Sequence, residues 1–210
     1  IIPAGCFNGC IELTKVELPS TITKISNDAF SNCCNLIDIL ISDVVTEIGS
    51  SAFHNCSNLC KIQIPDSVIE IGPSAFEGCR SLESINLSQK IKYINCNTFR
   101  GCELLNKIWI PKNVAIIGSE AFGGCENMSI VAIQSNHIKI DPTAFLQCSN
   151  ISRLYLANNN PNVVISSFGD SIAIKIISPI SDYDRIKSSA STSAEDLYKT
   201  HATNLKYMAL

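Results

Sequence analysis

The chain has 210 residues, of which 46% are hydrophobic and 17% charged, so it can bury a continuous core and is not a disordered protein. Its net charge of −3 argues against a nucleic-acid-binding protein, which needs a basic surface. The sequence lacks any apolar run of about 18 residues or more, so it predicts no membrane span.

The opening residues "IIPAGCFNGC" read as the middle of a structural unit that then repeats along the chain. Phenylalanine recurs every 23 residues, at Phe7, Phe30, Phe53, Phe76, Phe99, Phe122, Phe145 and Phe168. Cysteine follows three residues later, at Cys10, Cys33, Cys56, Cys79, Cys102, Cys125 and Cys148. A fixed period of about 20 to 50 residues is typical of a solenoid.

Each unit reads L-x-x-I-x-I-P-x-x-V-x-x-I-G-x-x-A-F-x-x-C, from which the elements of one coil follow in order. The alternating I-x-I predicts a strand with one inward face, ended in several coils by proline. V-x-x-I predicts a second, short extended segment, followed by a glycine that tolerates a left-handed turn. The Ala and Cys of A-F-x-x-C are four residues apart, which predicts one helical turn. We expect about seven coils, with their strands about 4.8 Å apart in a parallel sheet.

The cysteines have three alternative interpretations: metal ligands, disulfides or buried thiols. One cysteine per coil forms a column that does not converge on a tetrahedral site, which disfavours zinc. Disulfides between coils remain open, because the coil spacing lies within the allowed Cα separation. Stacked side chains run parallel, however, so we expect Cys33, Cys56, Cys79, Cys102 and Cys125 to be buried, unpaired and unmetallated. Cys6, Cys34, Cys60 and Cys96 lie off the column and form no specific metal motif.

This unit resembles the BspA-like, or Treponema pallidum-type, leucine-rich repeat over about residues 1–178, for example in "LCKIQIPDSVIEIGPSAFEGCRSL". The resemblance implies a curved, right-handed solenoid with a concave parallel sheet. It also implies surface or secreted adhesion proteins of bacteria and parasitic protists, with host extracellular-matrix proteins among their partners. The chain departs from the pattern near its end, where Asn160 replaces an apolar residue and Ser171 replaces the cysteine.

Residues 179–210 break the period and are predicted to form a C-terminal cap over the repeat array of residues 1–178. The stretches "SDYDRIKSS" and "SAEDLYKTHA" predict two short helices, with Ser181 and Ser193 as N-caps. The first coil has no such cap. We expect upstream repeats or another molecule to cover it, and it is a candidate surface for self-association.

No catalytic constellation stands out in the sequence. His54, His137 and His201 fall far apart in the coil geometry, and the carboxylates are scattered singly over the coils. We therefore predict no enzyme activity, no cofactor and no metal site.

The surface predicted to bind a partner is the concave sheet, where residues alternating with the buried I-x-I face outward. Trp109 is the only tryptophan, Tyr155 lies two coils away in the same column, and the small Ala132 lies between them. With the flanking Lys107 and Arg153, these two rings form the predicted binding patch, which would favour an acidic partner.

The leading interpretation is a non-enzymatic, adhesin-like module at the cell surface or secreted, which presents the concave sheet to a protein or glycan. The alternative is an intracellular, cytoplasmic scaffold that binds another protein through the same sheet. Free thiols would favour this alternative, because they persist in reducing compartments.

Overall fold

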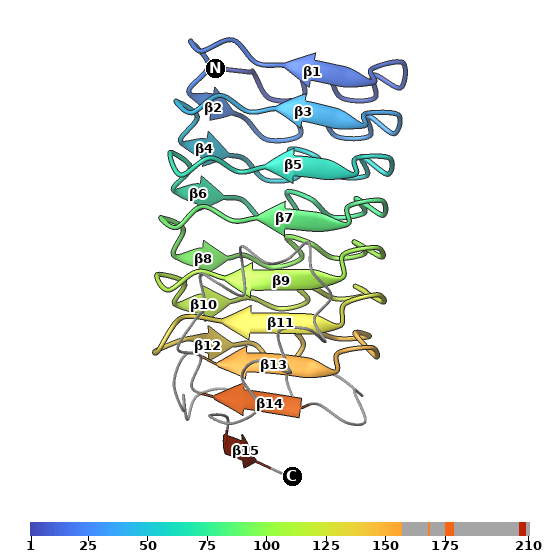
Figure 1. The fold of residues 1–210 in the computed structure, drawn as a ribbon. Coiled ribbons are helices and arrows are strands. Elements are labelled where there is room, and N and C mark those ends of the chain that lie inside the picture. The colour runs from blue at the N-terminus through green and yellow to red at the C-terminus, as the bar shows by residue number, and fades with distance from the viewer. Residues whose placement is uncertain (157–167, 169–174, 179–205, 209–210) are drawn as a thin grey trace.

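The computed structural model describes residues 1–156, 168, 175–178 and 206–208, which form one stack of coils (Figure 1). The longer strands occupy one side of the stack: β1 (Lys15–Glu17), β3 (Asp38–Leu40), β5 (Lys61–Gln63), β7 (Ser84–Asn86), β9 (Lys107–Ile110), β11 (Ile130–Ile133), β13 (Arg153–Leu156) and β14 (Lys175–Ser178). Two-residue strands form a second side: β2 (Lys24–Ile25), β4 (Glu47–Ile48), β6 (Glu70–Ile71), β8 (Tyr93–Ile94), β10 (Ile116–Ile117) and β12 (Lys139–Ile140). We call these the long-strand side and the short-strand side.

Every parallel pair among β1 to β13 joins residues 23 positions apart, for example Lys15 with Asp38 and Ile117 with Ile140. The expected parallel solenoid is therefore confirmed. Backbone pairing divides the long-strand side into the sheets β1-β3-β5-β7 and β9-β11-β13-β14-β15. The last strand, β15 (Lys206–Met208), pairs antiparallel with β14, so the sheet ends on a strand of opposite direction.

A column of phenylalanine rings runs through the core. All seven from Phe30 to Phe168 are fully buried, and neighbouring rings stack with centroids between 4.7 and 5.5 Å apart. Each interior ring therefore contacts the coil before it and the coil after it. Because every coil buries its apolar side chains mainly against its neighbours, stacking provides the core that one coil alone could not form.

The A-F-x-x-C segment is not the predicted helical turn; the structure replaces it with consecutive β-turns. Inside the coil, the N–H groups of Ser31 and Cys33 donate three residues back, to Asp28 and Phe30. The alternate N–H groups donate to the next coil, as from Phe30 to the Ala52 carbonyl at 2.8 Å. A helix directs its N–H groups to carbonyls four residues back in the same segment, whereas these turns leave every second N–H to join the coils. No α-helix occurs among the residues that the structure describes.

The corner residue before each cysteine adopts the left-handed conformation, which the sequence predicts instead at the glycine after V-x-x-I. Asn32 and Asn55 have φ angles of 59° and 57°, and Gly78 has 74°. The prediction of a left-handed turn at that glycine is wrong, because φ is not positive at Gly49, Gly72 or Gly118. Glycine is needed there for a different reason. A Cβ on Gly72 would lie 2.4 Å from the backbone nitrogen of Ser50, so glycine is needed there for the close approach of the previous coil.

The predicted cysteine column is present, and all five cysteines named for it are fully buried. Each of their thiols donates to the carbonyl oxygen of a phenylalanine in the preceding coil, as from Cys79 Sγ to Phe53 at 3.2 Å. A thiol that donates is protonated, and burial raises the pKa of Cys56 to about 12. The cysteine thus fills a tight corner and satisfies a buried carbonyl at once.

The four cysteines off the column lie nearer the surface: Cys6 and Cys96 are exposed, and Cys34 and Cys60 are half-buried. The two predicted helices of the C-terminal cap lie outside the described residues, so the division into residues 1–178 and 179–210 stays a prediction. Among the residues described, the chain contains no helix with the length and apolar character that a membrane span requires.

Candidate binding surface on the long strands

The strands of the long-strand side turn one face inward and one outward. In β5, Ile62 is buried between the exposed Lys61 and Gln63, and β3 and β7 repeat this pattern. We call the outward face of β1, β3, β5 and β7 the outer face. Two columns of exposed side chains cover it, namely Lys15, Asp38, Lys61 and Ser84 in the first, and Glu17, Leu40, Gln63 and Asn86 in the second.

Charges on the outer face alternate in sign instead of accumulating. Lys15 Nζ lies 2.9 Å from Glu17 Oε1 in an exposed ion pair, and the hydrogen bond to Glu17 raises the pKa of Lys15. Asp38 follows Lys15 in register, and Lys61 follows Asp38. Such a surface favours a partner with matching polar groups rather than a polyanion or polycation.

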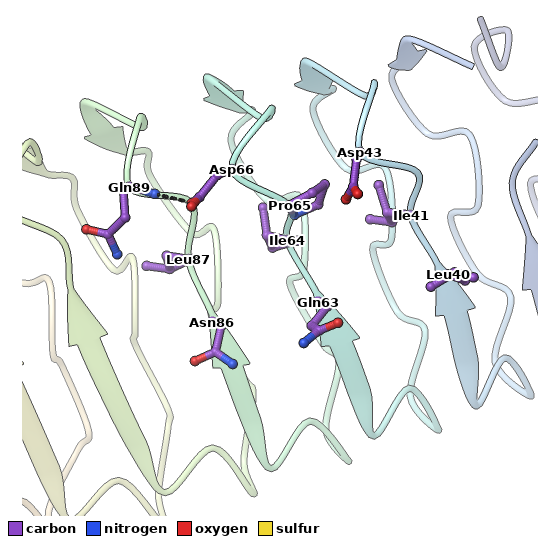
Figure 2. Close-up of a pocket in the computed structure, with 10 residues that line it drawn as sticks. All are labelled: Leu40, Ile41, Asp43, Gln63, Ile64, Pro65, Asp66, Asn86, Leu87 and Gln89. Atoms are coloured by element: carbon purple, nitrogen blue, oxygen red, sulfur yellow. Dashed lines mark hydrogen bonds between the residues drawn. The ribbon is translucent and has the colours of Figure 1, made fainter. Parts of the chain in front are cut away.

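A groove borders this face where the strands β3, β5 and β7 end (Figure 2). Its volume is about 570 Å³, and Figure 2 shows the residues that line it. Leu40, Gln63 and Asn86 line it from the second outer column, together with the edges of Ile41, Ile64 and Leu87. Leu40 is 58% exposed and provides an apolar contact point in the groove.

The rim of the groove is polar because the corner that follows each strand brings Asp43, Asp66 and Gln89 into line. Asp66 Oδ1 accepts a hydrogen bond of 2.9 Å from the backbone N–H of Gln89, as the dashed line in Figure 2 shows. Among the described residues, no hydrogen bond engages the side-chain amides of Gln63 or Asn86. The groove therefore offers free amide donors and acceptors beside an apolar contact.

The structure brings the predicted patch residues into register but buries the two rings. Trp109 pairs with Ala132, and Ala132 with Tyr155, as the repeat required. Trp109 and Tyr155 are each only 8% exposed, and burial raises the pKa of Tyr155. Lys107 and Arg153 are half-buried. The second outward column is thus accessible on β1 to β7 and buried on β9 to β13, where the first column is half-buried.

The groove was not singled out from the sequence, although a signal for it existed. Asp43, Asp66 and Gln89 share one slot of the repeat, three polar residues that follow the strand by the same offset. These residues lie beyond the end of the strand, so the sequence does not show that their side chains border the outer face. The conformation of the corner determines that.

No group of three or more His, Cys, Asp or Glu side chains in the described part of the chain could hold a metal ion. His54 and His137 lie on different coils, and His201 lies outside the described residues.

Comparison with known proteins places the repeat in a family. The profile of the BspA type leucine-rich repeat region matches residues 1–102 and 69–197, with six copies. The solved T. pallidum leucine-rich repeat protein is 29% identical, with 68% of this chain and 69% of that chain covered and a TM-score of 0.62. No curated protein matches the chain.

The pneumococcal vaccine antigen PcpA is 22% identical with a TM-score of 0.56, over 84% of this chain and 42% of that one. At this identity the likeness shows the fold alone, and the chain spans less than half of the pneumococcal protein. A leucine-rich cell surface protein from Faecalibacterium prausnitzii is 21% identical, with 81% and 66% covered and a TM-score of 0.48.

Proposed function

Because the chain belongs to the BspA-type leucine-rich repeat family, we propose that it is a non-enzymatic binding module that docks a partner protein on its outer face. One observation carries the proposal. The two outward columns are exposed over β1 to β7, whereas the same columns are buried or half-buried over β9 to β13. The accessible stretch also contains the groove.

The side chains of the outer face can be adapted to a partner because they do not pack in the core of the fold. Inward positions of β3, β5 and β7 are all isoleucine, but the outward positions change from coil to coil. Backbone pairing between coils fixes the strands that carry these side chains, so little backbone entropy is lost when a partner binds. Apolar contact at Leu40 and the amides of Gln63 and Asn86 would supply affinity and orientation.

The predicted patch of Trp109, Tyr155, Lys107 and Arg153 remains part of the proposal, as the far end of the same surface. In the stack of Figure 1, β9 follows β7, so the patch adjoins the accessible face. The burial of both rings means that their removal also costs packing. Binding and thermal stability must therefore be measured on the same variants.

For the biological setting, we propose that the protein is adhesin-like, that it is secreted or displayed at the cell surface, and that its partner is a host protein or glycan. The support is the family resemblance. The alternative, a cytoplasmic scaffold, is favoured by one observation: the buried cysteines Cys33, Cys56, Cys79, Cys102 and Cys125 remain thiols, which suit a reducing compartment. Self-association through the first coil stays part of the proposal.

The test begins with a partner identified by pulldown and by glycan array with the purified chain. Leu40→Arg and Gln63→Arg should each weaken its binding at least tenfold, about 1.4 kcal/mol or more, without lowering thermal stability. Leu104→Arg is the matched control, because Leu104 is 45% exposed and lies on a turn away from the outer face. If Leu104→Arg abolishes binding while the two outer-face variants bind normally, the site lies elsewhere.

A further inference from the structure

The short-strand side contains an exposed apolar surface that the proposed function does not use. In β8, β10 and β12 the first residue points outward and the second is buried, giving the column Tyr93, Ile116 and Lys139. Tyr93 and Ile116 are register partners on adjacent strands and are 51% and 41% exposed. Two large apolar side chains thus lie side by side in the solvent.

The first coils have charged residues at the equivalent positions of this column. Lys24 and Glu47 occupy it on β2 and β4, and their charged groups lie 2.6 Å apart. The fold therefore accepts charged residues at this exposed position, and core packing does not require an apolar side chain there. The change to Tyr93 and Ile116 is not required by the stacking of coils, and a third exposed apolar side chain, Ile69 at 57%, precedes Glu70 one coil earlier.

Lysines surround this apolar pair. Lys92 precedes Tyr93, and its carbonyl accepts a hydrogen bond of 2.8 Å from the Ala115 N–H, beside Ile116. Lys139 follows Ile116 in register on β12. Neither lysine forms an ion pair with any residue of the described chain.

Two acids lie near these lysines. Glu70 occupies the same column one coil before Tyr93. Asp141 accepts hydrogen bonds from the Thr143 N–H and hydroxyl at 2.9 and 2.7 Å, and these bonds, with a weaker attraction to Lys139, lower its pKa. Asp141 is thus held mainly by Thr143, which leaves both lysine ammonium groups available to a partner.

We propose that Tyr93, Ile116, Lys92 and Lys139 form a second docking surface, the β8–β12 patch, for a protein segment that mixes acidic and apolar residues. Apolar residues of the partner would cover Tyr93 and Ile116, and its carboxylates would pair with the lysines. An aromatic anchor with charges at its rim is the usual composition of a binding centre. The charge complementarity selects an acidic segment over a basic one.

The experiment measures binding of the purified chain to fluorescent synthetic peptides in which Asp or Glu alternates with Leu or Phe. Peptides with Lys in place of the acids, and heparin as a purely charged polyanion, complete the set. Three double variants are compared: Tyr93→Ser with Ile116→Ser, Lys92→Glu with Lys139→Glu, and the matched control Lys15→Glu with Lys61→Glu on the outer face. All altered side chains are exposed, so folding is expected to persist and is checked by thermal unfolding.

The expected result is that an acidic–apolar peptide binds the parent chain, that both patch variants lose at least tenfold in affinity, and that the outer-face control stays within about twofold. The proposal is overturned if none of the acidic–apolar peptides binds the parent chain. It is also overturned if heparin binds equally well and only the lysine variant loses affinity, because the site would then recognise charge alone. A parent chain that dimerises in sedimentation, and becomes monomeric in the Tyr93 and Ile116 variant, would overturn it by identifying a second copy as the occupant.

The outer-face control separates this proposal from the proposed function. Lys15→Glu with Lys61→Glu alters the outer face alone, so a partner that docks there responds to the control and not to the β8–β12 patch variants. Either proposal can therefore fail while the other stands.

Discussion

The phenylalanine column is the feature of the core most directly open to test, and Phe76 lies near its middle. Its side chain is fully buried, and its ring lies 5.3 Å from Phe53 and 5.5 Å from Phe99, centroid to centroid. Phe76→Ala would leave a cavity bounded by both neighbouring coils. Core substitutions of this kind cost about 3–5 kcal/mol, and each lost aromatic stacking contact adds toward the upper end of that range.

The assay is urea unfolding followed by circular dichroism. With a denaturant slope of about 2 kcal/mol/M, a loss of about 4 kcal/mol lowers the midpoint by about 2 M. Phe76→Leu should lose less, because its smaller cavity keeps most apolar contacts. Tyr93→Ser is the exposed control and should stay within about 0.5 kcal/mol of the parent. A loss below about 1 kcal/mol for Phe76→Ala would contradict its place in the column.

Four further predictions concern the corners, the thiols and the patch. A buried thiol such as Cys56 should lower the free energy of unfolding by about 1.4 kcal/mol per pH unit as the pH rises from about 9 to about 12, because the thiol ionises in the unfolded chain first. Urea titrations at several pH values measure this fall, which should be shallower in Cys56→Ala. Gly72→Ala should lose about 1–3 kcal/mol by thermal or urea unfolding, since its Cβ would meet backbone, whereas Gly101→Asn should be tolerated because asparagine accepts a φ of 69°. A thiol reagent should label the exposed cysteines of the native chain quickly and most of the eleven after denaturation without reductant; recovery of only one would show that the rest are paired. Trp109→Ala and Tyr155→Ala should each weaken partner binding at least tenfold and also lower the unfolding temperature, and unchanged binding would remove the predicted patch from the proposal.

The sequence alone determined the repeat, the inward columns and the strand register. These follow from a constant period of 23 residues, because equal spacing places equivalent residues on top of one another in every coil. The burial of Phe30 and Cys33, and the pairing of Ile116 with Lys139 in the next coil, needed no more than that period. Hydrophobic alternation in I-x-I is local, so it can be read without knowing the tertiary structure.

Tertiary structure decided the rest, because the deciding contacts run between coils. The A-F-x-x-C spacing fits one helical turn as well as it fits β-turns, and only the hydrogen bond from Phe30 to Ala52 in the next coil selects the turns. The sheet alternation of Trp109 and Tyr155 predicts their direction but not their exposure, which depends on what packs against that face. The groove at Asp66 and the apolar pair of Tyr93 with Ile116 likewise exist only once the coils are stacked, since each combines residues 23 positions apart into one surface.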